Sequence, residues 1–336
     1  MTQRERTLHV ILFVSLICLS FQISAAQDPG YKYFSVGEPN GGVVRKTVAG
    51  YALMGGGQDQ DAAFRWMCDR AGGGDFLVLR ASGTDAYNSY IRSLGQALNS
   101  AGTLIITSRQ GANQPFVAEK IRTAAAVFIA GGSQDNYINF WQGTPVEEAL
   151  NLAVKKGVPV GGTSAGLAVL GEYSFAALKD TVKSSEALSN PFHERVTITR
   201  DFLHVPLFNG TITDSHFVAR DRMGRLIAFL ARIITDGWSR APFGIGVDEK
   251  TAVLVDADGS ARVTGVGAAY FLRAPGPPER CVPNAALTYR NISVYRLTAA
   301  AGTFNLKSWT GSGGLEYRLS VENGVLGSSL PNNQIY

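Results

Sequence analysis

Ser164 lies at the centre of a stretch whose residue types suit nucleophilic chemistry. Residues 162–166 read Gly-Thr-Ser-Ala-Gly and fit the pattern G-x-S-x-G. An apolar run at 158–160 precedes them, and a run compatible with a helix follows at 167–170. Small neighbours let a strand bend sharply into a helix, so that the hydroxyl projects alone beside the free N–H groups of the helix start. The stretch indicates either a catalytic serine or a glycine-rich turn whose serine caps the helix.

A serine nucleophile needs a base, and the segment 213–225 offers one in His216. Three arginines follow it within nine residues: Arg220, Arg222 and Arg225. The apolar pattern predicts one helix over 216–235, which would place these arginines together as a cationic patch. Such a patch can hold carboxylates through paired hydrogen bonds. Alternatively, this is a solvated helix face on which Asp221 pairs with Arg225.

Strands and helices alternate in the first half of the chain. Apolar runs predict strands at 47–54, 75–80, 103–107, 125–130 and 158–160. Helical patterns lie between them, at 59–70, 87–100, 114–123, 136–141 and 145–156. This alternation predicts a three-layer, doubly wound α/β fold with a mostly parallel sheet, in which sites form at the carboxyl ends of strands. Glycines cluster at three such ends, at 55–57, 131–132 and 161–166.

The second half of the chain has a less regular pattern. Residues 171–200 indicate loop with short strands, and 203–212 an extended segment. Two antiparallel strands are expected at 243–255 and 260–271, joined by the turn Asp-Ala-Asp-Gly. Residues 287–326 alternate apolar and polar side chains, which predicts a small C-terminal β appendage.

Residues 1–26 have the features of a cleavable secretory signal. Arg4 and Arg6 precede an apolar run at 10–21, and small residues form a cleavage site before Gln27. The apolar run is too short to span a bilayer. We therefore predict a secreted or periplasmic protein without stable membrane anchoring.

The composition argues against several functional classes. The 336 residues carry a net charge of +4 without a dense run of lysine or arginine, so nucleic-acid binding is not expected. The four histidines lack the spacing of metal ligands, and neither a metal nor an organic cofactor is expected. Cys68 and Cys281 would remain in the exported chain, and nothing in the sequence fixes whether they pair. A monomer and a homodimer both fit the sequence.

Four separated motifs lie in the same order as in a known family. They are Gly-Gly-Ser-Gln at 131–134, Gly-Thr-Ser-Ala-Gly at 162–166, the histidine and arginine segment 214–225, and Gly-Ile-Gly-Val-Asp-Glu at 244–249. Together they resemble cyanophycinase, a serine exopeptidase-like enzyme of peptidase family S51, to which peptidase E also belongs. The resemblance spans residues 47–272. It departs at Ser133, where cyanophycinase has aspartate, and at Leu167, which replaces a small residue.

The resemblance implies a role for each matching residue. Ser164 would attack the substrate carbonyl, and His216 would take its proton and return it to the leaving amine. The backbone N–H of Ala165, with that of Gly132 or Gly131, would bind the oxyanion. The positions that match the family's substrate-binding residues are Gln134, Asp214, Arg220, Arg222 and Arg225.

The third member of the triad is expected between the serine and the histidine, where the family has its acid. Glu186 is the first choice, because it precedes a proline-bearing loop as the family's acid does. Asp180 and Glu172 are the alternatives.

The family's substrate, cyanophycin, is a polyaspartate with arginine on each side-chain carboxyl, and its products are β-aspartyl-arginine dipeptides. The resemblance thus implies an exported serine peptidase for cyanophycin or related β-aspartyl peptides, on a class I glutamine amidotransferase-like fold. An α/β-hydrolase-type esterase and a non-catalytic binding homologue are the alternatives. The expected division is a signal at 1–26, a lead-in at 27–46, a cyanophycinase-like domain at 47–274 and a β-rich extension at 285–336.

Overall fold

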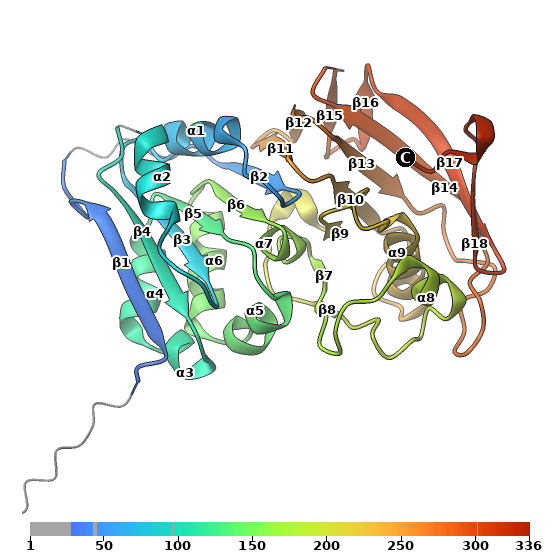
Figure 1. Ribbon diagram of the computed structural model, residues 1–336, viewed down its shortest axis with the longest axis horizontal. Coiled ribbons are helices and arrows are strands. Elements are labelled where there is room, and N and C mark those ends of the chain that lie inside the picture. Colours follow the sequence, from blue (N-terminus) through green and yellow to red (C-terminus); the bar gives the residue numbers. More distant parts are fainter. Residues whose placement is uncertain (1–27, 43–45, 96, 301) are drawn as a thin grey trace, which may run out of the picture.

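The computed structural model describes residues 28–42, 46–95, 97–300 and 302–336; the predicted signal segment lies outside these ranges. Two β-sheets organise the chain (Figure 1). The strands of the first, sheet A, are β1 (Tyr31–Gly37), β2 (Gly50–Met54), β3 (Asp75–Arg80), β4 (Ser100–Ile106), β5 (Ala126–Ile129), β6 (Val160–Thr163), β11 (Thr251–Asp256), β12 (Ser260–Gly265), β15 (Thr303–Asn305) and β16 (Thr310–Ser312). Their order across the sheet is β1-β4-β3-β5-β6-β2-β11-β12-β15-β16.

Sheet A has a parallel centre and antiparallel edges. Strands β4, β3, β5, β6 and β2 run parallel to one another, as the alternating pattern predicts. β1 pairs antiparallel with β4 on one side, and β11 pairs antiparallel with β2 on the other. The sheet as a whole is therefore mixed, and the predicted mostly parallel sheet describes its centre only.

Helices cover both faces of the parallel centre. They are α1 (Asp61–Arg70), α2 (Tyr87–Leu94), α3 (Arg109–Ala112), α4 (Pro115–Thr123), α5 (Gln134–Trp141) and α6 (Pro145–Lys155). Successive strand residues point to opposite faces, so Leu53 and Leu77 pack in the same cluster as α4 and α6, whereas Met54 and Phe76 pack with α1. The result is a helix–sheet–helix arrangement in which the strand ends near Ser164 are fixed from both sides.

The second sheet, sheet B, is formed mainly by the later part of the chain. Its strands are β7 (Tyr173–Phe175), β8 (Ile198–Arg200), β9 (Thr211–Asp214), β10 (Phe243–Val247), β13 (Ala268–Arg273), β14 (Tyr289–Thr298), β17 (Leu315–Glu322) and β18 (Val325–Ser328). The order is β18-β17-β14-β13-β10-β9-β7-β8. The helices of this part are α7 (Ala165–Ala168), α8 (Ser184–Ser189), α9 (Met223–Thr235) and the 3₁₀ turns η1 (Pro206–Phe208) and η2 (Pro331–Asn333). Helix α9 packs its apolar side on sheet B (Figure 1).

A bent antiparallel ribbon connects the two sheets. β10 pairs with β13 in sheet B, and their continuations β11 and β12 pair in sheet A. The predicted hairpin turn at 256–259 is confirmed, but each of the two predicted strands divides into two. The predicted appendage is not separate either, because β14 pairs with β13 and β15 pairs with β12. Both sheets thus continue into residues 287–328.

Two local predictions need correction, and one open question is answered. The helix expected over 216–235 begins only at Met223, because His216 and Asp221 have φ angles of 48° and 46°, which a right-handed helix does not allow. Residues 171–200 contain helix α8 as well as short strands. Cys68 and Cys281 are both buried and unpaired. Within the described ranges, no helix is both long and apolar enough to cross a membrane.

Candidate active site

Ser164 lies in a sharp turn between strand β6 and helix α7. Its φ and ψ angles are 54° and −115°, a conformation that residues other than glycine rarely adopt. Gly166 has no room for a side chain, since a β-carbon there would lie 1.9 Å from the carbonyl oxygen of Ile129. The amide of Ser164 donates to the carbonyl of Met54 at 3.1 Å, which ties the turn to the neighbouring strand β2. The strained turn is the geometry that the G-x-S-x-G spacing predicts for a projecting nucleophile.

His216 reaches the serine from sheet B. It follows strand β9, and its Nε2 lies 2.7 Å from Ser164 Oγ. Its backbone amide donates to the carbonyl of Gly55 at 2.7 Å, which ties it to the end of strand β2. Gly56 packs directly beneath the imidazole, and a β-carbon there would be 2.4 Å from its Cε1 atom. The predicted serine–histidine contact is therefore present in the structure.

Glu249 is the third residue in a series of hydrogen bonds that starts at Ser164 and passes through His216. It lies in the bend between β10 and β11, and its Oε1 atom is 2.6 Å from His216 Nδ1. A carboxylate at Nδ1 keeps the proton on that nitrogen and leaves the Nε2 lone pair free to accept the serine proton. Burial lowers the pKa of His216 despite the opposing effect of the Glu249 hydrogen bond. That hydrogen bond in turn lowers the pKa of Glu249, so the pair rests as neutral imidazole and carboxylate.

Glu186, the acid predicted from the sequence, does not contact His216. Its carboxylate accepts from the backbone amide of Lys183 at 2.8 Å and pairs with Arg195 at 2.9 Å. It therefore caps helix α8. The alternatives also lie elsewhere: Asp180 accepts from the amide that follows it in the chain, and Glu172 accepts from the amide of Gly210.

The carboxylate that faces His216 thus comes after the histidine in the chain. The sequence did contain a signal for it, because Glu249 ends the motif at 244–249. A carboxylate that directly follows the end of a sheet strand stands where sites of α/β proteins form.

The residues predicted for the oxyanion lie next to Ser164. Ala165 is the first residue of α7, so its N–H has no acceptor within the helix. A β-carbon on Gly131 would lie 3.3 Å from the serine Cβ, which places the second glycine segment beside the nucleophile. Tyr137 Oη donates to the carbonyls of Ala130 and Gly131. Because N–H and C=O point to opposite edges of a trans peptide, this leaves the N–H of Gly132 directed away from the tyrosine.

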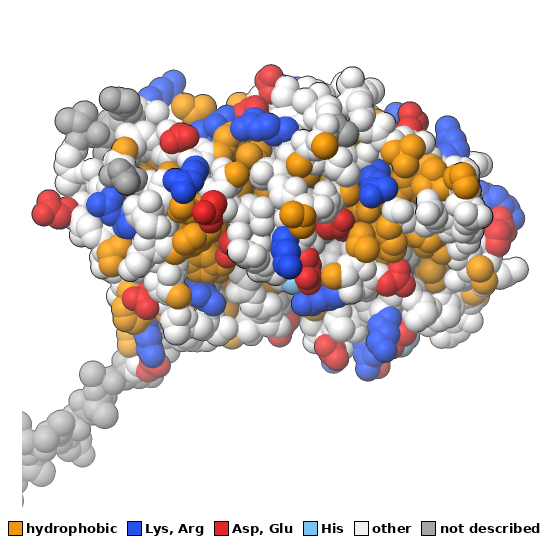
Figure 2. Space-filling view, turned by 45° about the horizontal axis from the view of Figure 1, so that its top comes forward, with side chains coloured by type: hydrophobic (Ala, Val, Ile, Leu, Met, Phe, Trp, Pro, Cys, Tyr) orange, Lys and Arg blue, Asp and Glu red, His pale blue; other side chains and the backbone are white. Residues whose placement is uncertain are grey.

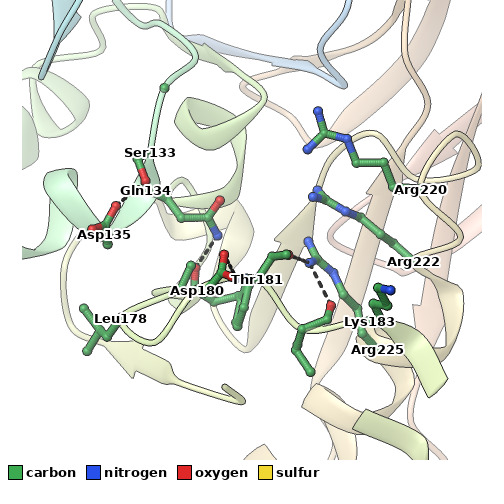
Figure 3. Close-up of a pocket in the computed structure, with 14 residues that line it drawn as sticks. Ser133, Gln134, Asp135, Leu178, Asp180, Thr181, Lys183, Arg220, Arg222 and Arg225 are labelled. Carbon is green, nitrogen blue, oxygen red and sulfur yellow. Dashed lines mark hydrogen bonds between the residues drawn. The ribbon is translucent and has the colours of Figure 1, made fainter. Parts of the chain in front are cut away.

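A pocket of about 590 Å³ opens at Gly132 and contains most of the predicted substrate-binding residues. We call it the arginine pocket. Figure 3 shows its two walls facing each other. The charged and amide side chains that line it are those of Gln134, Asp135, Asp180, Lys183, Arg220, Arg222 and Arg225. One wall therefore carries acidic and amide groups, and the opposite wall carries guanidinium groups and the ammonium group of Lys183.

Asp214 does not line this pocket but supports its basic wall. Its buried carboxylate accepts two hydrogen bonds from Arg225, at 2.8 and 2.6 Å, and one from Arg222 at 3.2 Å. Burial alone would raise the pKa of Asp214, but the two guanidinium groups outweigh it and hold the pKa below its usual range. Burial lowers the pKa of Arg222 to about 10, so it stays charged at neutral pH. Asp214 is thus placed to fix two arginines rather than to face a ligand.

Arg220 and Gln134 are predicted substrate-binding residues on opposite walls of the pocket. Arg220 is exposed and forms no ion pair within the part of the chain that the structure describes. Gln134 donates its side-chain amide to the carbonyl of Phe175, which holds it on the wall opposite the arginines (Figure 3). The suggested pair Asp221–Arg225 does not form, because Arg225 is buried against Asp214. In the space-filling view, acidic and basic side chains lie around a small patch of histidine near the middle of the molecule (Figure 2).

One family model matches the part of the chain that contains this site. The model of peptidase family S51 matches residues 53–262. The chain belongs to this family. The match includes the serine turn, the histidine, the arginines and Glu249, and it ends before the strands β13 to β18. Across the described residues, no group of three or more histidine, cysteine or acidic side chains is arranged to hold a metal ion.

Two relatives within reach of sequence comparison are described as cyanophycinases. The protein from Synechococcus elongatus is 29% identical over 209 residues, which are 60% of this chain and 59% of that protein. The protein from Trichormus variabilis is 31% identical over 165 residues, 49% of this chain and 50% of that protein. The chain thus matches between half and about three fifths of the length of these two relatives. A solved peptidase from an acI-B1 actinobacterium shares the fold, with a TM-score of 0.51 over 77% of this chain, 98% of its own and 17% identity.

Proposed function

We propose that this chain is a serine peptidase that hydrolyses cyanophycin or related β-aspartyl peptides and releases β-aspartyl-arginine dipeptides. The observation that carries the proposal is the contact of Ser164, His216 and Glu249 at hydrogen-bond distances beside the arginine pocket. A serine in contact with a neutral, carboxylate-oriented histidine is the arrangement that activates a hydroxyl for attack on an acyl carbon. The relatives described as cyanophycinases favour a peptide substrate.

The reaction follows from the positions of the atoms. Ser164 Oγ attacks the carbonyl carbon of the scissile amide as its proton passes to His216 Nε2. The N–H groups of Ala165 and Gly132 stabilise the oxyanion of the tetrahedral intermediate. His216 then gives the proton to the leaving amine, and an acyl-enzyme remains on Ser164. Water, deprotonated by the same imidazole, hydrolyses this ester and restores the serine.

The charges of the arginine pocket suit a substrate that carries both signs. A β-aspartyl-arginine unit has free carboxylates and one guanidinium group. Arg220 and Arg222 can hold the carboxylates through charge-assisted hydrogen bonds, and Asp135 and Asp180 stand opposite for the guanidinium. An acyl chain would have to remove these charged groups from water without compensation. This pocket therefore favours a peptide over a lipid-like ester.

The direct test is incubation of the purified protein with cyanophycin granules, followed by mass spectrometry of the released products. β-Aspartyl-arginine is the expected product, and α-linked aspartyl-arginine peptides should remain intact. p-Nitrophenyl esters serve as the comparison substrates. Rapid ester cleavage without any release of dipeptides would contradict the proposal and favour an esterase.

Arg220→Ala sharpens the test of carboxylate recognition. Loss of one charge-assisted hydrogen bond should raise KM for β-aspartyl-arginine substrates about tenfold, with a smaller effect on an uncharged ester. Arg240→Ala, in an exposed arginine outside the pocket, is the matched control and should leave both values unchanged. An equal rise in KM for charged and uncharged substrates would show that Arg220 does not recognise the carboxylates of the substrate.

We also propose that the protein acts outside the cytoplasm after removal of residues 1–26. The support is the order of a basic start, an apolar run and small residues before Gln27. Fractionation of the producing cells and N-terminal sequencing of the exported protein test this proposal. A protein that begins at Gln27 is expected, and an intact N-terminus in the cytoplasmic fraction would contradict it.

A further inference from the structure

The segment 217–222 carries two of the pocket arginines without being part of a helix. Its backbone closes on itself, with Arg220 N donating to the carbonyl of His216 at 3.0 Å and Arg222 N to that of Phe217 at 2.9 Å. Three further hydrogen bonds hold it from outside. Phe217 N donates to the carbonyl of Val247 at 3.2 Å, and Asp248 accepts from the amide of Val218 at 3.1 Å. Ser184 Oγ donates to the carbonyl of Asp221. Residues 218–221 are exposed. A turn of this kind needs support from outside if it is to fix Arg220 beside the triad.

Tyr336 supplies such support from the far end of the chain. Its hydroxyl donates to the carboxylate of Asp221 at 2.8 Å and accepts from the backbone amide of Met223 at 3.0 Å. Met223 is the first residue of helix α9, and its N–H has no acceptor within the helix. The one phenol group therefore joins the turn that presents Arg220 and Arg222 to the start of the helix that presents Arg225.

The tyrosine is itself held in place by aromatic and backbone contacts. Its ring meets Phe217 and Tyr270 edge-on, with centroid distances of 6.1 and 5.8 Å. The carbonyl of Ile335 accepts from the hydroxyl of Tyr317 at 2.7 Å, which anchors the preceding residue to strand β17. Phe217 directly follows His216 in the chain, so the ring of Tyr336 contacts the residue next to the proposed base. Burial raises the pKa of Tyr336, and the phenol therefore remains a donor at every pH relevant to activity.

We propose that Tyr336 is a positioning residue that sets Arg220 and Arg222 for substrate recognition. Residues 315–336 would then belong to the working enzyme and not to a separate appendage. The tyrosine touches neither the pocket nor the triad; it acts through Asp221 and the first amide of α9. Its effect on substrate binding rests on the proposed peptidase function, whereas its effect on the turn does not.

Tyr336→Phe tests the proposal, because it removes both hydrogen bonds and keeps the ring. Tyr289→Phe is the matched control: this buried tyrosine on strand β14 donates to the carbonyl of Gly276, away from the turn. We expect KM for β-aspartyl-arginine to rise three- to tenfold in Tyr336→Phe and to stay constant in Tyr289→Phe. The rate of labelling by a fluorophosphonate, which reports on Ser164 and His216, should change less than twofold in both variants.

Amide hydrogen exchange over residues 217–223 tests the turn independently of any substrate. The amides of Arg222 and Met223 should exchange faster in Tyr336→Phe than in the wild type or in Tyr289→Phe. Asp221→Asn keeps an oxygen acceptor and should behave as the wild type. Asp221→Ala removes one of the two hydrogen bonds of Tyr336, so it should give part of the effect of Tyr336→Phe and add nothing to it in the double variant.

The two readouts separate the two proposals. If the wild type cleaves no β-aspartyl peptide but exchange still accelerates in Tyr336→Phe, the peptidase proposal fails and the positioning of the turn stands. Unchanged exchange in Tyr336→Phe would overturn the inference. So would a loss of fluorophosphonate labelling in parallel with the rise in KM, because that indicates a general structural defect.

Discussion

Ser164 Oγ and His216 Nε2 lie 2.7 Å apart, but the two residues are held in place by different kinds of contact. On the serine side, a buried parallel strand and a close backbone approach at Gly166 fix the turn. On the histidine side, the end of β9 and the turn 217–222 that follows it meet the bend that carries Glu249, which is 33 residues beyond His216 in the chain. Side-chain hydrogen bonds and ion pairs join them.

This difference has a consequence for substitution. A bulky group that enters a close backbone contact displaces the whole turn, whereas a side-chain contact can be removed without disturbing the others. Variants on the serine side should therefore remove the chemistry, and variants on the histidine side should separate proton transfer from substrate recognition.

Ser164→Ala should have the largest effect. Loss of the attacking oxygen should lower kcat by roughly 10⁴-fold or more, as the removal of a nucleophile does in serine hydrolases. The melting temperature should stay constant, because no packed atom other than the hydroxyl is lost. Ser93→Ala, at an exposed serine on α2 that bonds only to a nearby carbonyl, is the control. Activity in Ser164→Ala above a hundredth of the wild type would remove Ser164 from the nucleophile role.

Glu249→Gln compared with Glu186→Gln tests the acid on the histidine side. The amide at 249 can no longer hold the imidazole as its Nδ1–H tautomer with a carboxylate, and kcat should fall by roughly 10³- to 10⁴-fold. Glu186→Gln keeps an oxygen that can accept from the amide of Lys183 but loses the ion pair with Arg195, so stability should change slightly and kcat should not. The reverse result in the two variants would restore Glu186 as the triad acid.

Gly56→Ala probes the contact between the two sides. A β-carbon there would lie 2.4 Å from His216 Cε1 and must displace the imidazole from Ser164. A shift of about 1 Å in a catalytic group can cost roughly 10²-fold in rate, and we expect kcat to fall by that amount. Gly237→Ala is matched in backbone strain, with φ of 74° against 94°, but has no neighbour within 4 Å. Equal activities of the two variants would mean that the β-carbon at position 56 does not move the imidazole of His216 from its working position.

The same division explains how much of the molecule could be predicted from the sequence. The parallel centre of sheet A was predictable because each strand and helix is a continuous run with its own period. The serine turn was predictable because its geometry depends on five consecutive residues. The arginine pocket could be predicted in part: Arg220, Arg222 and Arg225 do meet in one cavity, although a turn and not a helix carries the first two.

The remaining features depend on contacts between distant segments. Glu249 faces His216 only because a ribbon of four strand pieces bends between two sheets, and no local pattern records that bend. Asp214 is indistinguishable in sequence from an exposed ligand-binding carboxylate until its burial against Arg225 is known. Glu186 fits a local rule for an acid before a loop, but a local rule for helix capping describes it better.

The pH dependence of the proposed reaction should show the smallest effect and still separate the contacts of His216. The base acts as neutral imidazole, so kcat/KM is full above its pKa and is lost as the pH falls through it. Burial lowers this pKa, and the acid limb should lie below pH 6.5, the ordinary value for histidine. Removing the positive charge in Arg220→Ala should move the limb to higher pH, since that charge also lowers the pKa. Glu249→Gln should move it to lower pH, because the hydrogen bond that raises the pKa is lost. A limb at or above pH 6.5 in the wild type, or shifts of the same sign in the two variants, would contradict the assignment of His216 as the base.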